Sequence, residues 1–490
     1  MSIPTAPTPL PAFSPKQKRN AVIGVMLAMF LATLDQTIVA PALPTIGASL
    51  GDADFLPWII SGYLLTSTAV TPLYGKASDI YGRGPVLFIG LGIFVAGSII
   101  CALSTSMLAL VLGRAAQGLG GGGLIAMAQT VVADIVSPRE RGRYVVYFTT
   151  VWATSSVAGP ALGGLLASHW SWTLIFWINL PLGALAALIC SRTLRGAPQR
   201  RRNHRLDWVG SALITLATLG LMLVLTLGGV RVAWSSPGLL ALLATSLAIA
   251  GWLLAHLART PTPLIPLGLF RNGVVGAATL AIFFSMFAFV GSTVYLPIYF
   301  EYALGVDPEW AGAGLAALLG GSVIGANGAG RRMPRVAHYK AIAIWGLAVA
   351  GLALCALALL SARLNFWAAE ALILALGIGV GPLFPTATVS VQNAVDPADL
   401  GVATASLACL RALGSAVGVA ALGAILLAYR VIAADSAVPA VAGGEFAARA
   451  AQAFSFVFLA QALAVAASLL CLLRMEERPL RGPAATPIEP

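Results

Sequence analysis

Charged residues are scarce in this sequence. Only 10% of its 490 residues are Asp, Glu, Lys or Arg, whereas 59% are hydrophobic, and the mean hydropathy is +0.89. A soluble domain carries roughly 25% charged residues. The shortage therefore excludes an ordinary soluble protein with one buried core, and it indicates a chain that lies mostly within a lipid bilayer.

The residue patterns of soluble catalysis are also missing. The five cysteines form no CxxC pair, the four histidines are scattered, and no GxxxxGK[ST] loop is present. We therefore expect no enzyme activity, no metal site and no cofactor, with an ion gradient as the source of energy. The net charge of +11 does not indicate nucleic-acid binding, because loops on the cytoplasmic side of membrane proteins collect Lys and Arg.

What the chain has in abundance is long apolar runs, and a spanning helix needs about 20 such residues. We predict an all-α integral membrane protein with fourteen transmembrane helices. The predicted spans are 21–42, 57–74, 86–104, 107–133, 145–168, 173–191, 207–229, 237–258, 273–300, 310–330, 340–361, 366–387, 402–428 and 454–473.

The basic residues test this count of spans. With the N-terminus inside, the inner segments hold 23 of the 29 Lys and Arg residues, the outer loops hold four, and two lie within spans. Such a bias would not survive one miscounted helix near the middle of the chain. The pattern predicts a multi-pass protein of the cytoplasmic (inner) membrane with both termini in the cytoplasm.

An internal repeat indicates two related halves. Residues 118–142 and 377–401 share nine of 25 residues without gaps, at an offset of 259, which equals eight helices. Two six-helix halves around a central cavity are typical of transporters. We predict six parts: a tail at 1–20, a first half at 21–191, a basic linker at 192–206, two inserted helices at 207–258, a second half at 273–473 and a tail at 474–490.

One acid interrupts the first apolar run, "FLATLDQTIVAPALP" at 30–44. Asp35 lies roughly 21 Å from the inner edge of its helix, and Arg114 lies roughly 10 Å from the outer edge of the fourth helix, so both have nearly the same depth in a core about 30 Å thick. An acid and a base at one depth can pair. The pair either locks two helices together or carries a proton, and at offset 259 the second half has Val294 in place of the acid.

The segment "GKASDIYGRG", 75–84, joins the second and third predicted helices. Its glycines allow a tight turn, its acid can face a helix N-terminus or a basic partner, and its two cations are expected at the inner surface. An ordinary charged loop is the alternative. The glycines and charged residues are Gly75, Lys76, Asp79, Gly82, Arg83 and Gly84.

The segment "VAGPALGG", 157–164, interrupts the fifth helix. Pro160 favours a kink because it removes a backbone hydrogen bond. Gly159, Gly163 and Gly164 form a small-residue face on which another helix can pack closely. Helix packing without a role in gating is the alternative interpretation.

Three further polar side chains are candidates for the central cavity: Gln36, Glu370 and Arg411. Glu370 lies near a helix end, from which its carboxylate can also reach the interface. Arg411 cannot lose its charge and must face a cavity or a partner. Several aromatic residues could line a hydrophobic pocket or simply pack within the membrane, namely Trp58, Trp152, Phe283, Phe284, Phe287 and Phe289.

Taken together, these motifs resemble the major facilitator superfamily, and most closely its fourteen-helix drug:proton antiporters. The resemblance rests on "LDQTIVAPALP", "GKASDIYGRG", "LGRAAQGLGGG" and "GPALGG", which occur in order at the corresponding helices. It implies proton coupling for Asp35 and Arg114, conformational control for Gly75, Asp79 and Arg83, and an antiport-associated kink at Gly159, Pro160 and Gly164. The chain departs from the pattern at Ala40, Pro41, Gly84, Thr173 and Leu174.

These observations predict a proton-coupled antiporter. It would export amphipathic or lipophilic compounds, with cations favoured, by rocking two halves about a central cavity. The expected partners are these substrates, protons and the lipid bilayer, and the protein is expected to work as a monomer. Two alternatives stay open: a dedicated exporter of one metabolite, antibiotic or lipid, and a membrane sensor or scaffold that transports nothing.

Overall fold

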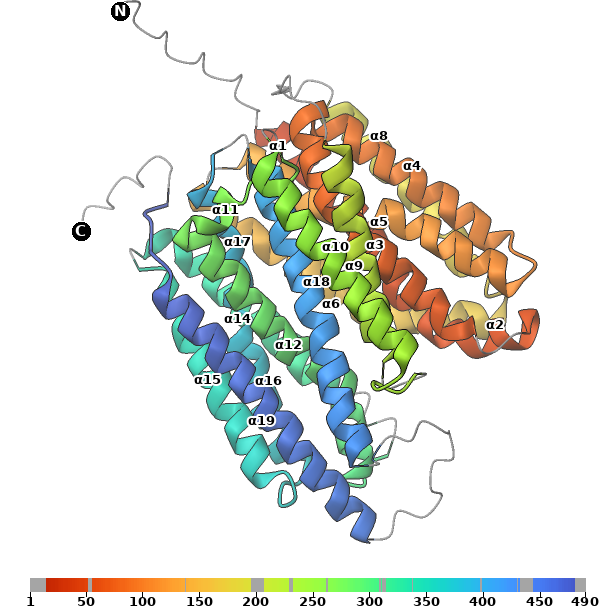
Figure 1. Ribbon diagram of the computed structural model, residues 1–490, viewed down its shortest axis with the longest axis vertical. Coiled ribbons are helices and arrows are strands. Elements are labelled where there is room, and N and C mark those ends of the chain that lie inside the picture. The colour runs from red at the N-terminus through yellow and green to blue at the C-terminus, as the bar shows by residue number, and fades with distance from the viewer. Residues whose placement is uncertain are drawn as a thin grey trace, which may run out of the picture.

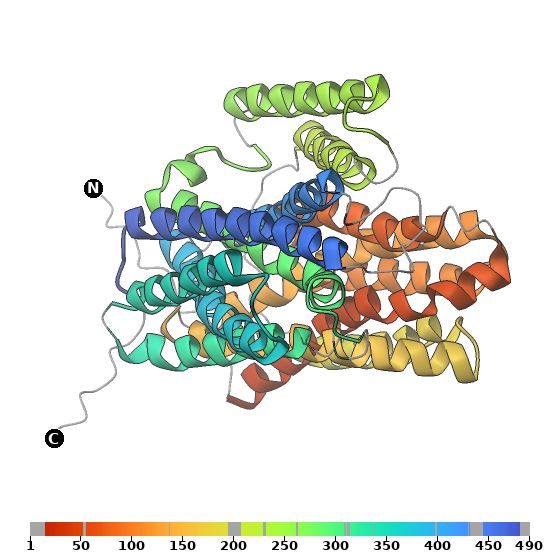
Figure 2. The same ribbon diagram turned by 90° about the horizontal axis from the view of Figure 1, so that it is seen from below.

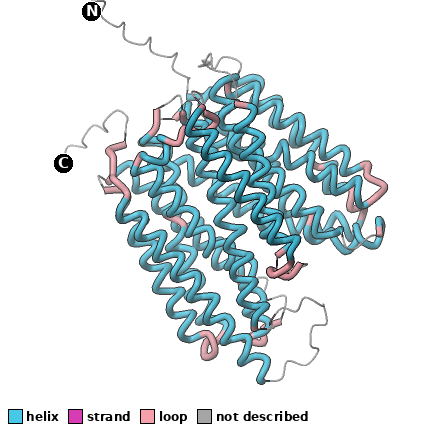
Figure 3. Tube along the Cα trace, in the orientation of Figure 1, coloured by secondary structure: helices cyan, strands magenta, loops and turns pink. Residues whose placement is uncertain are grey.

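The computed structural model describes most of the chain as helix (Figure 3). No β-strand occurs in the described part, where an isolated bridge joins Gly228 to Val232. Helix is the expected form for long apolar runs, because in lipid each backbone N–H and C=O must find its partner within the segment. The described residues are 15–51, 55–136, 138–194, 207–228, 232–260, 263–307, 310, 314–336, 338–396, 399–429, 431 and 444–480.

The first part of the chain forms a group of long helices with short joints. Its elements are α1 Pro15–Ile38, η1 Ala40–Ala42, α2 Leu43–Leu50, α3 Leu56–Tyr81, α4 Arg83–Ala102, α5 Met107–Ile135, α6 Pro138–His169, α7 Leu174–Trp177 and α8 Asn179–Leu194. The strongest contacts within this group join α5 to α3 and α4, and α1 to α6 and α8.

The last part of the chain forms a second group. Its elements are α11 Gly268–Arg271, α12 Gly273–Tyr302, α14 Leu315–Arg332, η3 Met333–Arg335, α15 Lys340–Leu360, α16 Phe366–Val380, α17 Leu383–Ala394, α18 Leu400–Ala428 and α19 Gly444–Arg474. Here α12 packs against α18 and α19, and α16 packs against α14 and α15.

Two helices lie between these groups in sequence and outside them in space. Helix α9, Trp208–Leu227, packs on α10, Pro237–Arg259, and also touches α3 and α18. Figure 2 shows the pair on the outer side of the bundle, with α10 outermost. Helix α9 therefore covers the seam where a helix of the first group meets a helix of the second.

Eleven of the described segments are long and apolar enough to cross a membrane. Three of the fourteen predicted spans fall outside this set, namely those of α3, α6 and α14, although each of them is helical and packs within the bundle. Their ranges are richer in Ser, Thr, Gly and Pro, which lowers their hydropathy. The structure therefore supports eleven spans, and the count of fourteen stays a prediction.

The two groups of helices meet at one end of the molecule, where α1 begins and α19 ends (Figure 1). There Met333, Tyr339 and Val389 of the second group join a buried cluster of the first, and Ile80 and Ala133 of the first join a cluster of the second. At the opposite end, the buried cluster around Ile38 and Trp172 contains only first-group residues among those described. The groups spread apart toward that end (Figure 1).

The joint between α3 and α4 is shorter than the sequence predicted. Helix α3 continues to Tyr81 rather than ending near residue 74, and α4 begins at Arg83, so Gly82 alone makes the turn with a φ of 94°. The prediction that Gly75 and Gly84 form the turn is wrong, because both lie within helices. A single residue suffices because glycine reaches this conformation without strain.

The predicted domain boundaries fall partly outside the described residues. Helix α8 extends to Leu194, into the predicted linker, and residues 195–206 of that linker are not described. The same holds for residues 1–14 and 481–490 of the predicted tails. The division of the chain into six parts therefore stays a prediction.

Candidate functional site

The acid and the base predicted to pair lie in contact. Arg114 Nη1 of α5 donates to Asp35 Oδ2 of α1 at 2.5 Å, and both side chains are almost fully buried, with exposed fractions of 1% and 0%. Arg114 Nε also donates to the Ile59 carbonyl at 3.0 Å. The guanidinium carbon lies 4.5 Å from the centre of the Tyr63 ring. The predicted ion pair between Asp35 and Arg114 is confirmed.

Three neutral polar side chains complete this cluster. Gln117 Nε2 and Asn179 Nδ2 donate to Asp35 Oδ1 at 2.8 and 2.7 Å, and Gln117 Oε1 accepts from Arg114 Nη1 at 2.7 Å. Ser98 Oγ accepts from Asn179 Nδ2 at 2.9 Å and donates to the Phe176 carbonyl. We call Asp35, Ser98, Arg114, Gln117 and Asn179 the buried polar cluster.

The buried polar cluster surrounds the Asp35 carboxylate with hydrogen-bond donors. Asp35 accepts hydrogen bonds from N–H donors of three side chains and donates none, which suits its ionised form. A lone charge at mid-helix would cost about 2.5–3.5 kcal/mol or more.

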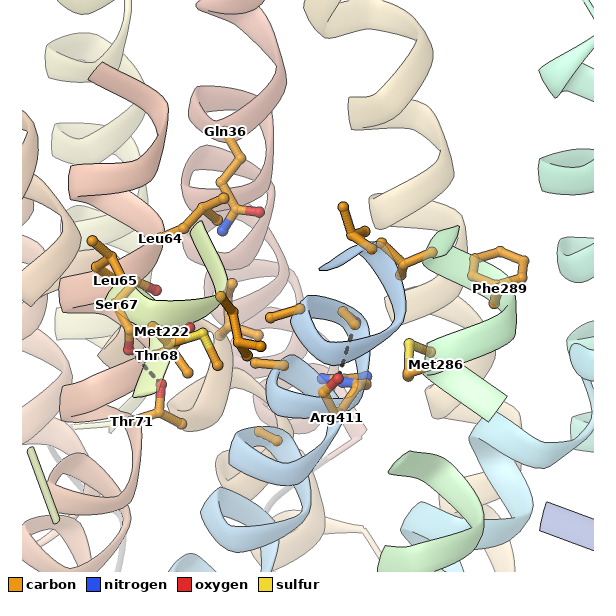
Figure 4. Close-up of a pocket in the computed structure, with 18 of the residues that line it drawn as sticks. Gln36, Leu64, Leu65, Ser67, Thr68, Thr71, Met222, Met286, Phe289 and Arg411 are labelled. Carbon is orange, nitrogen blue, oxygen red and sulfur yellow. Dashed lines mark hydrogen bonds between the residues drawn. The ribbon is translucent and has the colours of Figure 1, made fainter. Parts of the chain in front are cut away.

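A cavity of about 680 Å³ lies next to this cluster and is lined from both groups of helices (Figure 4). Helices α1, α3, α5 and α6 form one wall, α12, α17 and α18 form the other, and α9 contributes Met222 and Leu225. Gln36 lines the cavity as predicted, whereas no member of the buried polar cluster does. The buried ion pair is thus closed off from the cavity in this conformation.

Arg411 of α18 also lines the cavity, as predicted from its permanent positive charge. Figure 4 shows its guanidinium between Met222 and Met286 in that view. Among the described residues no carboxylate forms an ion pair with Arg411, and the Ser415 hydroxyl donates to its backbone carbonyl, not to its guanidinium, at 3.0 Å. The side chain therefore carries its positive charge into the cavity.

Two of the six predicted aromatic candidates line the cavity. Trp152 and Phe289 have ring centres 6.0 Å apart, and Phe289 meets Phe384 edge to face at 5.6 Å. These three rings form an apolar wall contributed by both halves of the molecule. The other four candidates, Trp58, Phe283, Phe284 and Phe287, are not among the lining residues.

Glu370 does not line the cavity. It lies in α16, where a side chain at Gly314 would meet its Oε1 at 2.5 Å, and this oxygen is buried without a hydrogen-bond partner among the described residues. The expectation that Glu370 is a cavity residue is therefore wrong for this conformation. Its position near a helix end could be read from the sequence, but the face of the helix on which it lies could not.

The "GKASDIYGRG" segment joins the two groups of helices. Asp79 accepts from the backbone N–H groups of Gly401 and Val402 at 3.1 and 3.0 Å, in the first turn of α18. Arg83 Nη1 lies 2.5 Å from Asp79 Oδ1, and Arg83 Nε donates to Asp134 Oδ2 at 2.6 Å. Asp79 thus meets both partners expected of it, a helix N-terminus and a base.

Two other residues of this segment behave differently from the prediction. Lys76 is 6% exposed and therefore buried rather than at the surface. Gly75 lies where α3 crosses α18, and a Cβ there would approach the Gly401 carbonyl oxygen to 2.7 Å. The glycine is needed for close approach of the two helices and not for a turn.

The small-residue face of α6 packs on the end of α1. A Cβ at Gly159 would overlap Thr37, and one at Gly163 would overlap the Ile38 carbonyl, so the predicted packing face is confirmed. Gly164 has more room, with Pro41 as its nearest neighbour at 3.9 Å. Helix α6 continues through Pro160, and the predicted kink stays a prediction.

Sequence reasoning missed Ser98, Gln117 and Asn179. Neutral polar residues are common in spanning helices, so none of them stands out as a charge does. The available signal was spacing: Gln117 follows Arg114 by three residues and so shares its face of α5. Asn179 begins α8 in "WINLP", and nothing in its local pattern indicates a distant carboxylate.

Relatives of this chain are transporters by name. It is 32% identical over 441 residues to an uncharacterized MFS-type transporter of Mycobacterium tuberculosis, covering 88% of this chain but only 64% of that relative's length. It is 30% identical to the multidrug transporter protein MdtP of Bacillus subtilis, covering 84% of this chain and 76% of MdtP.

The fold has known counterparts as well. The structure of a bacterial homologue of the iron transporter ferroportin, in an outward-facing state, superposes with a TM-score of 0.65 at 12% identity, covering 94% of this chain and 99% of that one. The family model described as Major Facilitator Superfamily matches residues 25–419. The chain belongs to the Major Facilitator Superfamily, whose members are transporters and not enzymes.

Proposed function

We propose that this protein is a proton-coupled antiporter that exports amphipathic small molecules by alternating access. The observation that carries the proposal is a titratable carboxylate buried in one half, beside a cavity that both halves line. Asp35 is the proton carrier, Arg114 is its switchable partner, and Ser98, Gln117 and Asn179 orient the carboxylate. An acid with these partners can couple its protonation to helix packing without touching the substrate.

The arrangement of the two halves fits the outward-open state of an alternating-access cycle. Contacts between the halves, including Asp79 on the first turn of α18, gather at the end where α1 begins and α19 ends. With the termini in the cytoplasm, that end is the inner one, so the conformation is closed inside and opens outward. The Asp79–α18 contact would have to break when the inner end opens.

We further propose the fourteen-helix arrangement of the drug:proton antiporters. Eleven spans and the helices α3, α6 and α14 together account for all fourteen apolar segments, and the 23-to-4 distribution of basic residues supports it. On this scheme α9 and α10 are the inserted pair, the protein works as a monomer in the cytoplasmic membrane, and its energy comes from the proton gradient. No cofactor is required by the proposed cycle.

The test is Asp35→Asn, measured as substrate-induced dissipation of a pH gradient in reconstituted vesicles. A panel of chemically unrelated amphipathic dyes is the probe. We expect proton-coupled flux to fall to the background of empty vesicles, because asparagine keeps the shape of the side chain but cannot carry a proton. Flux without a gradient, by exchange of labelled for unlabelled dye, should persist.

Glu370→Gln is the matched control, since it removes another carboxylate within a helix, one that is outside the buried polar cluster and the cavity. It should leave proton-coupled flux intact. Unchanged flux in Asp35→Asn would rule out the assignment of the proton site. A single accepted dye in the panel would instead favour the dedicated exporter, and no flux with any dye would favour the sensor or scaffold.

A further inference from the structure

The charge of the cavity has one source. Arg411 is the one charged side chain among the described residues that line it, and Asp, Glu, Lys and His are absent from that lining. The other polar groups there are neutral hydroxyls and amides, such as Thr33, Gln36 and Gln129. A cavity with a fixed positive charge and low-dielectric walls attracts anions and repels cations.

The two arginines within spans show why Arg411 is suited to a ligand. Arg114 is satisfied by protein groups, with Asp35, Gln117 and the Ile59 carbonyl as its hydrogen-bond partners. Arg411 has no carboxylate within ion-pair distance among the described residues. A guanidinium cannot neutralise itself by losing its proton. Its planar array of donors fits a carboxylate or sulfonate, which would supply the missing charge.

The rest of the cavity suits a hydrophobic body. Trp152, Phe289 and Phe384 form a continuous aromatic wall, and Met222 and Met286 line the same cavity (Figure 4). Aromatic rings and flexible thioethers accommodate varied apolar shapes. A volume of about 680 Å³ falls within the range of sites for drug-sized molecules, about 300–1,000 Å³.

We propose that the transported substrates are lipophilic organic anions, whose acidic group binds Arg411 while the apolar body packs on Trp152, Phe289 and Phe384. This inference rests on the proposed function and names the substrate class of the same cavity. It replaces the preference for cations that the resemblance to drug exporters suggested, since a cation would enter a cavity that already holds an unpaired positive charge.

The proposal changes the electrical character of transport. With one proton entering for each substrate that leaves, export of a monovalent anion moves two positive charges inward. Export of a monovalent cation under the same exchange moves no net charge. An inside-negative membrane potential would therefore drive anion export and leave cation export unaffected.

The binding experiment uses three probes with one aromatic body: pyrenebutyrate, the neutral alcohol pyrenebutanol, and pyrenebutyl trimethylammonium. Binding to the full-length protein in nanodiscs at neutral pH is followed by energy transfer from tryptophan to pyrene. We expect the wild type to bind the anion most tightly and the cation most weakly. In Arg411→Gln the affinity for pyrenebutyrate should fall at least about tenfold, as for loss of a charge-assisted pair, while pyrenebutanol changes little.

Arg411→Lys keeps the charge and should restore part of the affinity for the anion, which separates a charge effect from a packing defect. Arg363→Gln is the matched control because Arg363 is exposed and outside the cavity lining. Equal binding of pyrenebutyrate by Arg411→Gln and Arg363→Gln would overturn the proposal, as would tighter binding of the cation by the wild type. Binding is compared only for variants whose gel-filtration profile matches that of the wild type, which shows that they are folded.

The test of the anion site at Arg411 can fail or succeed independently of the test of the proton site at Asp35. If pyrenebutyrate binds through Arg411 but Asp35→Asn leaves flux unchanged, the anion site stands and the proton site fails. If Asp35 is essential for flux but only the cation is bound or moved, the proton site stands and the anion site fails. Stimulation of pyrenebutyrate export by a potassium diffusion potential, in the wild type and not in Arg411→Gln, would support both.

Discussion

The two halves of the molecule place their unusual charges differently. In the first half the acid and base are buried together, whereas the equivalent positions of the second half are apolar. The repeat offset of 259 pairs Asp35 with Val294, Ser98 with Leu357, Arg114 with Ile373 and Gln117 with Leu376. Leu357, Ile373 and Leu376 are fully buried, so these sites form ordinary packed core in the second half.

In the cavity the charged residue belongs to the second half and its apolar equivalent to the first. Arg411 of the second half corresponds at the same offset to Trp152 of the first, and both line the cavity. The fold therefore tolerates either a polar or an apolar residue at each pair of positions. The proposed proton site thus lies in the first half, and the charge proposed to bind the substrate lies in the second.

The largest effect should come from breaking the ion pair on one side. In Arg114→Met the carboxylate of Asp35 loses its cation in a buried site, which costs about 3–5 kcal/mol when one partner of such a pair is removed. We expect a large drop in melting temperature by scanning fluorimetry, together with loss of proton-coupled flux. A melting temperature unchanged from the wild type would show that the pair is not buried as described.

The same comparison of the two halves can be tested by replacing Asp35 and Arg114 with the residues at the equivalent positions of the second half. The double variant Asp35→Val, Arg114→Ile should recover most of the stability lost in Arg114→Met, because well-packed apolar residues often replace a buried ion pair without loss. It should still lack proton-coupled flux. A folded double variant that keeps full coupling would end the proposed division between the halves.

The contact between the halves should give a smaller effect. Asp79→Asn weakens the hydrogen bonds to Gly401 and Val402 and the ion pair with Arg83, at about 1–3 kcal/mol for a buried acceptor. We expect the inner end to open more often, detected as faster labelling of a cysteine placed at Ala405, a residue in the contact with α3. Glu476→Gln, which alters an exposed carboxylate, should leave the labelling rate unchanged.

The packing of α6 on α1 offers a matched pair of variants. Gly163→Ala would push a methyl group into the Ile38 carbonyl, and overpacking of this kind costs about 1–3 kcal/mol. Gly164→Ala, one residue away, has room and should be nearly neutral. Similar melting temperatures for the two variants would contradict the close approach of the helices.

The smallest effect concerns the inserted pair of helices. Asp207 accepts from the Gly210 N–H at 2.8 Å and from His256 Nε2 at 2.9 Å. Although partial burial raises the pKa of this carboxyl, the hydrogen bond from Gly210 and the contact with His256 outweigh it and hold the pKa below its usual range. A lowered pKa stabilises the folded state above the unfolded value and loses that contribution as pH falls through the folded value.

Asp207→Asn should therefore lower the melting temperature slightly at neutral pH, as for loss of a helix cap worth about 1 kcal/mol. The difference from the wild type should shrink only below about pH 4, where an unperturbed aspartate is protonated. Melting curves of both proteins between pH 7 and pH 3.5 check this. A difference that grows as the pH falls would contradict the direction of the pKa shift.

The pairing of two charges within helices could be predicted from the sequence, and the face of a helix on which a residue lies could not. Counting residues from a helix end was enough to pair Asp35 with Arg114. Both Glu370 and Arg411 were predicted as possible cavity residues, yet only Arg411 lines the cavity. Which way a side chain points depends on rotation of the helix against its neighbours, and a helix that is apolar all round carries little periodic signal to fix that rotation.

Contacts between segments far apart in the chain could also not be predicted from the sequence. Asn179 donates to both Asp35 and Ser98 only because α8 packs against α1 and α4. The glycine at position 75 was assigned to a turn because glycine serves turns and close packing equally well. Only the crossing of α3 over α18 distinguishes the two uses.

Helix α9 covers the seam between α3 and α18 and reaches the cavity through Met222 and Leu225. If the two halves rock, α3 and α18 must slide past each other beneath this helix. While α9 stays in place, Met222 and Leu225 form part of the cavity lining at this seam. A displacement of α9 would open the seam between α3 and α18 laterally to the bilayer. A lipophilic molecule could then enter the cavity from the membrane leaflet in which it dissolves.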